Sequence, residues 1–313
     1  MPSQVAGFAL FLLRRLLGIA VLVWLVTLAA FGLFRLGVPS QFVDRQINAQ
    51  LGAGESASWQ YAHYLLRLLH GNLGESATVG LPVSTVLWRA LPPTLSLVIG
   101  GMLLWLSLGF AGGMVSAARQ GSWADRVING AALTAGIIPT FLLAVLLLGV
   151  FSLEASRGFL WMQPGYFPLS HGVVQWLGRM ILPWIAMVAA QLGLTTRLTR
   201  SAALEVLGED YIRTAHAKGV SESRIFWTHV LRSAVIPVIP STSVGLGALL
   251  GSAAIVDQTF TLGGIGQVLL LSVANHDIMV IMGTVLFAVI LISLVNLIAD
   301  IIVALLDPRV RLA

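Results

Sequence analysis

Residues 208–240 read GEDYIRTAHAKGVSESRIFWTHVLRSAVIPVIP, a basic and polar island between two apolar segments. Its pattern predicts two short helices, over 211–218 and 221–234, that meet at Gly219. Ser221 suits the N-cap of the second helix, and Glu222 suits the positive end of its dipole. We interpret the island as a loop that docks another protein. The alternative is an ordinary positively charged loop at the cytoplasmic face of a membrane.

The chain on either side of the island is strongly apolar. Of its 313 residues, 57% are hydrophobic and 10% are charged, and the mean hydropathy is +0.91. A soluble domain usually has a charged fraction of about 25%. The composition therefore predicts an all-α integral membrane protein and excludes a soluble globular domain.

Apolar runs long enough to cross a bilayer occur six times. They cover roughly 12–34, 94–118, 128–153, 180–197, 236–257 and 278–305. We expect the first run to be a retained helix, because it is longer than the apolar core of a signal peptide and Phe34-Arg35 is a poor cleavage site. We treat residues 1–313 as one transmembrane domain.

The positions of the basic residues predict the orientation. With the N-terminus in the cytoplasm, most Lys and Arg side chains, including those of the island, fall in inside segments. The positive-inside rule then places both termini and the loop 198–235 in the cytoplasm, and the long segment 35–93 outside. The net charge of +5 reflects this topology and contact with anionic lipid, rather than binding of nucleic acid.

The outer segment contains an expected amphipathic helix. Residues 59–76 read WQYAHYLLRLLHGNLGES, with apolar side chains at helical spacing at Tyr61, Tyr64, Leu65, Leu68 and Leu69. We expect this helix to lie in the membrane interface and to lead into the second span through residues 91–93, Leu-Pro-Pro.

Several motifs match a known family in order and spacing. They are Arg213-Thr214-Ala215, Gly219 and Val235-Ile236-Pro237 in the island, then Gly263-Gly264-Ile265-Gly266-Gln267, Asn275-His276-Asp277 and Leu306-Asp307-Pro308-Arg309. In these motifs the chain resembles permeases of bacterial ATP-binding-cassette (ABC) importers, of the dipeptide, oligopeptide and nickel permease family. Two departures are Arg213, where the loop motif usually opens with Glu, and Gly37-Val38-Pro39, where Gly-Asp-Pro is usual.

The resemblance implies six transmembrane helices of the type I importer kind, in the bacterial inner membrane. It also implies a second homologous permease, two cytoplasmic ABC ATPases and an extracytoplasmic solute-binding protein as partners. ATP and Mg would be bound by the ATPase subunits, because this chain has no GxxxxGK motif and its sole lysine, Lys218, lies in another setting. We expect no cofactor in the chain itself.

The expected cargo is a peptide or a similar small solute, and the first alternative is a metal chelate such as a nickel complex. An ion-coupled secondary transporter would need inverted repeats and ionisable residues at the midplane, and neither is visible. An intramembrane enzyme would need a buried nucleophile or a metal constellation, which the sequence also lacks.

Two sets of candidate site residues follow. For docking of the ATPase we expect Glu209, Asp210, Tyr211, Arg213, Thr214, Ala215, Lys218 and Gly219. Polar side chains inside apolar runs should face a cavity or a partner rather than lipid. The pathway candidates are therefore Gln191, Thr195, Ser241, Ser243 and Asn296.

No catalytic residue and no metal site is expected, since His63 and His70 lack a third ligand nearby. Asp257 and Asp300 lie near the ends of apolar runs. We interpret both as solvated or interhelical structural carboxylates, and the alternative is a role in a pathway or relay.

Overall fold

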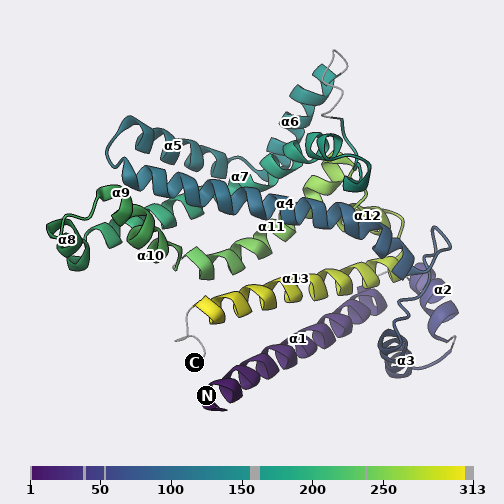
Figure 1. Cartoon of the computed structure of the whole chain (residues 1–313). Helices are drawn as coiled ribbons and strands as arrows, with labels where there is room; N and C mark the ends of the chain where they lie inside the picture. The colour runs from purple at the N-terminus through teal and green to yellow at the C-terminus, as the bar shows by residue number, and fades with distance from the viewer. Residues whose placement is uncertain (1, 38–39, 53, 156–162, 237, 307–313) are drawn as a thin grey trace. The chain divides into compact units, whose positions relative to one another are not determined.

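The structure, a computed structural model, describes residues 2–37, 40–52, 54–155, 163–236 and 238–306. Within these ranges the regular structure is helical, and β pairing is limited to an isolated bridge between Glu75 and Pro82. The longer helices (Figure 1) are α1 (Pro2–Gly37), α2 (Ser40–Leu51), α3 (Ala57–Leu69), α4 (Val83–Ala118), α5 (Trp123–Ile137), α6 (Thr140–Ala155), α7 (Val173–Leu207), α11 (Val238–Phe260), α12 (Ile265–Ala274) and α13 (Ile278–Leu306). The prediction of an all-helical fold is confirmed.

The chain divides into two compact units. Unit 1 comprises Met1–Thr94 and Gly263–Ala313, and unit 2 comprises Leu95–Leu262. The boundary inside α4 directly follows Pro92 and Pro93, which lack the N–H groups that would continue the backbone ladder of the helix. We expected 91–93 to lead into this span, but α4 begins at Val83 and includes both prolines.

Four helices are long and apolar enough to cross a membrane by themselves. They are Leu10–Arg35, Val83–Ala118, Val173–Leu207 and Ile278–Ile298. Within the described residues, the predicted six spans are reached only when two broken helix pairs are each counted as one span. These pairs are Trp123–Ile137 with Thr140–Phe151, and Gly245–Phe260 with Ile265–Ala274.

The prediction of one continuous helical span over 128–153 is wrong. α5 and α6 are separate helices, bent by 101° at a short break. Pro139 disfavours helical backbone at the residue before it, and Ile138 is accordingly extended, with φ −74° and ψ 123°. A single proline therefore ends α5 within an apolar run that otherwise reads as one helix.

Unit 1 has a core between α1, α2, α3, the start of α4 and α13. Its buried side chains include Phe31, Ile47, Tyr64, Leu87 and Met279. The predicted face of α3 is partly confirmed: Tyr64 is buried in this core, whereas Leu69 at the end of the helix is 83% exposed.

A polar network ties the segment before α4 to the start of α13. Asp277 Oδ2 accepts hydrogen bonds from the Ser76 hydroxyl (2.5 Å) and from the N–H of Thr78 (3.1 Å). The side chain of Gln46 donates to the carbonyl of His276 (2.9 Å) and accepts from the N–H of Ile278 (3.0 Å). The segment before α4 is therefore a folded part of unit 1, held at the turn before α13.

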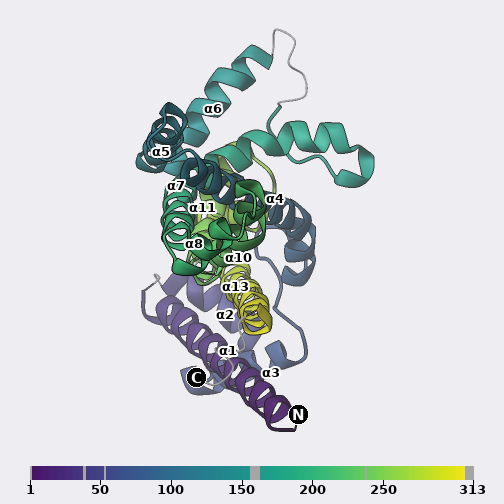
Figure 2. The same ribbon diagram turned by 60° about the vertical axis from the view of Figure 1, so that its left-hand side comes forward.

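In unit 2, glycines let α4, α5 and α11 approach their neighbours closely. A Cβ added at Gly109 of α4 would lie 2.9 Å from the Cβ of Thr195 of α7, and one added at Gly193 of α7 would lie 2.7 Å from the carbonyl oxygen of Ala132 of α5. Gly245 of α11 faces the ring of Trp105 in the same way. α5 and α7 run side by side (Figures 1 and 2). α7 also contacts α6, α10 (Leu231–Val235) and α11, so it is the central helix of unit 2.

Candidate functional site

The island begins with α8 (Asp210–Ala217), which is anchored by one side and exposed on the other. Ile212 is 1% exposed and packs in a cluster with Ala202 and Ala203 of α7 and Met114 of α4. Tyr211, one position earlier, is 47% exposed. The burial of one apolar residue therefore fixes the helix on unit 2 and turns its other face outward.

Gly219 ends this helix in a left-handed conformation. Its φ is +76°, its N–H donates to the carbonyl of His216 (2.9 Å), and the N–H of Val220 donates to the carbonyl of Ala215 (3.2 Å). These two bonds form a Schellman motif, which glycine favours because it has no Cβ to clash. The predicted meeting point of two helices at Gly219 is confirmed.

The second helix of the island is built from three consecutive pieces. They are α9 (Glu222–Ile225), a π-helical turn η3 (Phe226–Val230) and α10 (Leu231–Val235). Ser221 has the extended backbone of an N-cap, but its side chain makes no capping hydrogen bond. Ile225, Val230 and Ala234 are buried in the same cluster as Ile212, so both halves of the island rest on one apolar base.

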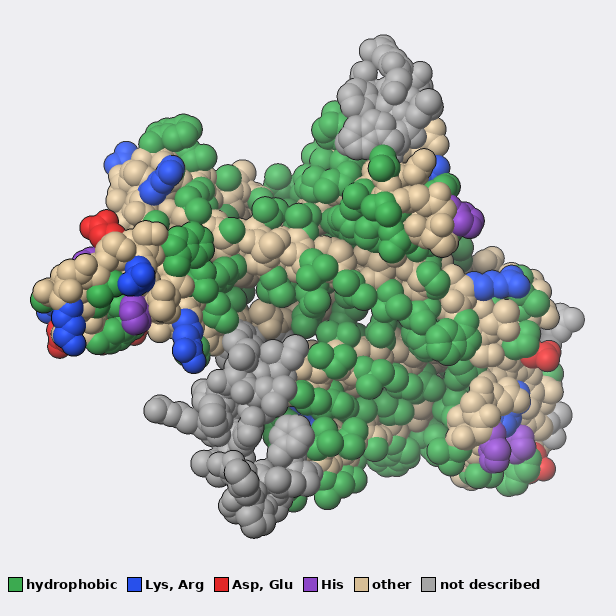
Figure 3. Space-filling view, viewed as in Figure 1, with side chains coloured by type: hydrophobic (Ala, Val, Ile, Leu, Met, Phe, Trp, Pro, Cys, Tyr) green, Lys and Arg blue, Asp and Glu red, His purple; other side chains and the backbone are tan. Residues whose placement is uncertain are grey.

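The docking candidates share one exposed surface, which we call the α8 platform. Glu209, Asp210, Tyr211, Arg213, Thr214, Lys218 and Gly219 are exposed, and Ala215 is half-buried against the apolar base. Arg213 and Asp210 form an ion pair of 3.1 Å that is open to solvent. Such an exposed pair contributes about 0–1 kcal/mol to stability, so both side chains are free to bind a partner. In unit 2, charged side chains gather over α8–α10 (Figure 3).

Sequence reasoning missed two aromatic residues of the island. Trp227, in the π-helical turn, is 64% exposed, and the ring of His229 meets the ring of Tyr211 edge to face at 6.4 Å. π-helical turns occur often at functional sites. The adjacent aromatics Phe226 and Trp227 within a basic island were the signal available in the sequence.

The four pathway candidates of unit 2 lie on α7 and α11. Gln191 is half-buried on α7, whereas Thr195 is buried and accepts a hydrogen bond from Trp105 Nε1 (2.7 Å). Ser241 donates to the carbonyl of Val238 (2.7 Å) within α11. The side chain of Ser243 lies outside the described residues.

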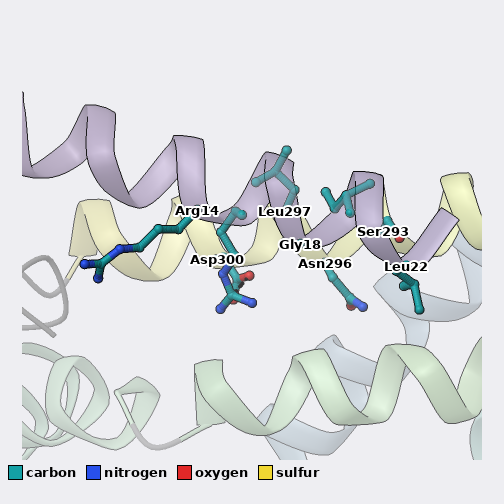
Figure 4. Close-up of a pocket in the computed structure, with 9 residues that line it drawn as sticks. Arg14, Gly18, Leu22, Ser293, Asn296, Leu297 and Asp300 are labelled. Atoms are coloured by element: carbon teal, nitrogen blue, oxygen red, sulfur yellow. Dashed lines mark ion pairs between the residues drawn. The ribbon is translucent and has the colours of Figure 1, made fainter. Parts of the chain in front are cut away.

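Asn296 belongs to unit 1 and lines a hollow of about 290 Å³ between α1 and α13. Its Oδ1 is buried and has no hydrogen-bond partner in the described part of the chain. Asp300, one turn further along α13, forms an ion pair of 2.9 Å with Arg15 of α1. Asn296 and Asp300 point to the same side of α13 (Figure 4). Because Asp300 pairs with Arg15 of α1, it is an interhelical carboxylate, one of the two structural roles expected from the sequence.

Comparison with known proteins defines the class. Residues 109–312 match the family described as "binding-protein-dependent transport system inner membrane component". The matched region contains the α8 platform and every pathway candidate. The chain belongs to this family of ABC transporter permeases.

Its relatives are permeases along nearly their whole length. A putative peptide transport system permease protein of Brucella abortus is 34% identical over 276 residues, covering 88% of this chain and 86% of the relative. The glutathione transport system permease protein GsiC of Salmonella typhimurium is 34% identical over 312 residues, covering 96% and 98%. A probable peptide ABC transporter permease protein of Sinorhizobium fredii is 29% identical over 313 residues.

The chain is therefore a multi-pass permease subunit of an ABC importer. Permeases of this family are transport subunits rather than enzymes, and they work with ATPase and solute-binding partners.

Proposed function

We propose that this chain pairs with a second homologous permease to form the membrane pathway of a bacterial importer for peptides or similar small solutes. The names of the relatives, which refer to peptide and glutathione transport, support this cargo over a metal chelate. A solute-binding protein would deliver the solute from outside, and two cytoplasmic ATPases would supply the energy. In this proposal, units 1 and 2 act together as one transmembrane domain over 1–313.

The observation that carries the proposal is the α8 platform. A short helix with one buried anchor and an exposed polar and aromatic face suits the groove of a partner protein. The candidates for contact are Glu209, Asp210, Tyr211, Arg213, Thr214, Ala215, Lys218 and Gly219, joined by Trp227. The ATPase would bind ATP and Mg on its own residues, so this chain needs no nucleotide site.

The connection between α8 and α7 supports a route for the force. Only Gly208 and Glu209 separate the two helices, and Ile212 packs on Ala202 and Ala203 of α7. A displacement of α8 by the closing ATPases would therefore move α7, because their contact is rigid and apolar. α7 contacts α5, α6 and α11, so its movement would reach the other spans of unit 2 and alternate the access of the pathway.

Substitutions at Gly219 test the platform. Gly219→Val places a β-branched side chain at φ +76°, at a cost of about 1–2 kcal/mol, and should displace α8 from its Schellman turn. Gly219→Asn is the matched control, since Asn tolerates this backbone and nothing lies within 4 Å of an added Cβ. We expect Gly219→Val to reduce uptake and co-purification of the ATPases, and Gly219→Asn to retain both.

Wild-type uptake and wild-type ATPase recovery in Gly219→Val would remove the platform from the coupling mechanism. ATP hydrolysis by the purified chain alone would contradict the assignment of the ATPase to partner subunits.

A further inference from the structure

A basic hollow lies in unit 2 where α5 faces α7. The two helices touch at Gly193, and residues of both helices also line a space of about 470 Å³. The side chains that line it are Asp125, Arg126 and Asn129 of α5, and Arg197, Arg200 and Ser201 of α7. We call this space the arginine hollow.

One arginine of the hollow is held in place by a carboxylate. Arg200 Nε donates to Asp125 Oδ1 and Nη2 donates to Oδ2, each at 2.9 Å, which is a bidentate pair. Asp125 Oδ1 also accepts from the amide of Asn129 (2.7 Å) and from the Ser116 hydroxyl, and Oδ2 accepts from the N–H of Gly121 (2.9 Å). Both oxygens of the Asp125 carboxylate therefore accept hydrogen bonds, and the Arg200 guanidinium is held in a fixed position at the side of the hollow.

The other two arginines keep their positive charge available. Arg126 and Arg197 are exposed, and no carboxylate pairs with either in the described part of the chain. Arg197 uses its Nε for the carbonyl of Gly193 (3.1 Å), which orients the guanidinium and leaves its terminal nitrogens free of that bond. Since one carboxylate faces three guanidinium groups, the hollow carries a net positive charge.

Exposed apolar side chains lie on the same two helices as the hollow. Trp123 lies at the start of α5, and Leu133 of α5 and Leu194 of α7 lie further along the two helices; all three are exposed. Tryptophan at the end of an apolar helix is typical of the membrane–water interface. A basic pocket between membrane helices that also carry exposed apolar side chains matches the chemistry of an anionic lipid, whose headgroup is charged and whose chains are not.

We propose that the arginine hollow binds the phosphodiester headgroup of an anionic phospholipid. Arg126 and Arg197 would contact the phosphate oxygens, because a planar guanidinium matches their geometry. The acyl chains would lie along Leu133 and Leu194. Arg200 shapes the hollow through Asp125 and is a positioning residue. Inorganic phosphate shares the headgroup chemistry but has no chains to lie along these apolar side chains.

Native mass spectrometry of the full chain in detergent, titrated with phosphatidylglycerol or phosphatidylcholine, tests the proposal. The variant is Arg126→Gln with Arg197→Gln, which keeps the length of the side chains and removes the charge. The matched control is Arg224→Gln with Arg232→Gln, two exposed arginines of α9 and α10. Each basic residue near a lipid surface contributes about a fivefold factor, so the variant should bind phosphatidylglycerol about thirtyfold more weakly than wild type, and the control should not.

Two further measurements distinguish a lipid headgroup from a free phosphate ion and show whether loss of binding reflects misfolding. Arg126→Lys with Arg197→Lys should retain most of the phosphatidylglycerol binding, and inorganic phosphate should not compete with that lipid at equal concentration. Equal binding of phosphatidylglycerol by wild type and the Gln variant would overturn the proposal. So would equal affinity of wild type for the two lipids, or competition by inorganic phosphate, which would point to a soluble anion.

Discussion

Asp125 shows how much of unit 2 depends on one side chain. Its carboxylate receives hydrogen bonds from Ser116 near the end of α4, from the turn at Gly121 and from Arg200 of α7. It also stands in the first turn of α5, where a negative charge suits the helix dipole. The start of α5 is therefore tied to two other helices through one ionised group.

Removal of this group should destabilise the fold. Asp125→Ala leaves Arg200 without its bidentate partner, and we expect the thermal midpoint in detergent to fall on the order of 5 °C. Asp210→Ala is the control, because it removes the same group from an ion pair whose side chains are 93% and 75% exposed. Its midpoint should stay within about 1 °C of wild type. Equal shifts of the thermal midpoint in the two variants would show that the Asp125 network stabilises the fold no more than an exposed ion pair does.

At the scale of elements, the packing of unit 2 depends on where a glycine lacks room for a side chain. Gly193 of α7 and Gly247 of α11 both lie inside helices, and the local sequence does not show which of them is closely packed. A Cβ at Gly193 would meet the backbone of Ala132, whereas one at Gly247 would meet nothing within 4 Å. Of the glycines at 245, 247 and 251 in α11, only Gly245 is closely packed within the chain, where it faces Trp105.

Alanine substitutions at the two glycines should separate these cases. Gly193→Ala forces α5 away from α7, at a cost of about 1–3 kcal/mol for overpacking. Gly247→Ala adds a methyl group in open space and should leave stability unchanged or slightly higher, because alanine favours helix. Thermal unfolding of both variants in detergent provides the measurement. A Gly193→Ala variant as stable as Gly247→Ala would contradict the close contact between α5 and α7.

For the whole molecule, the decisive property is the side of the membrane on which each segment lies. The positive-inside rule predicts that the α8 platform lies in the cytoplasm and α3 outside. Ser58 of α3 and Ser221 before α9 are both exposed, and the chain has no cysteine. A cysteine introduced at either position would therefore report the side of the membrane rather than burial.

We expect Ser58→Cys to react with an impermeant thiol reagent in intact spheroplasts, and Ser221→Cys to react only after the membrane is opened. The two variants serve as controls for each other, since each should be labelled fully in lysed cells. The reverse pattern in intact spheroplasts would invert the orientation and move the α8 platform away from any cytoplasmic ATPase.

The sequence by itself determined the class of the molecule and the plan of the island. Apolar runs of bilayer length predict the membrane helices, because a helix in lipid must be apolar along its whole length. Gly219 predicts the meeting point of two helices, and the structure has a left-handed turn there, with φ +76°. Both signals are local: they depend on the length of a run and on the backbone freedom of one residue.

Only the tertiary structure decided which side chains meet. The pairing of Arg200 with Asp125 joins residues 75 positions apart, and the hydrogen bond from Trp105 to Thr195 joins residues 90 positions apart. The sequence placed Thr195 among the pathway candidates, and it could not reveal this bond. Helical periodicity states which residues share a face of one helix, but the neighbour of that face is set by the packing of several helices together.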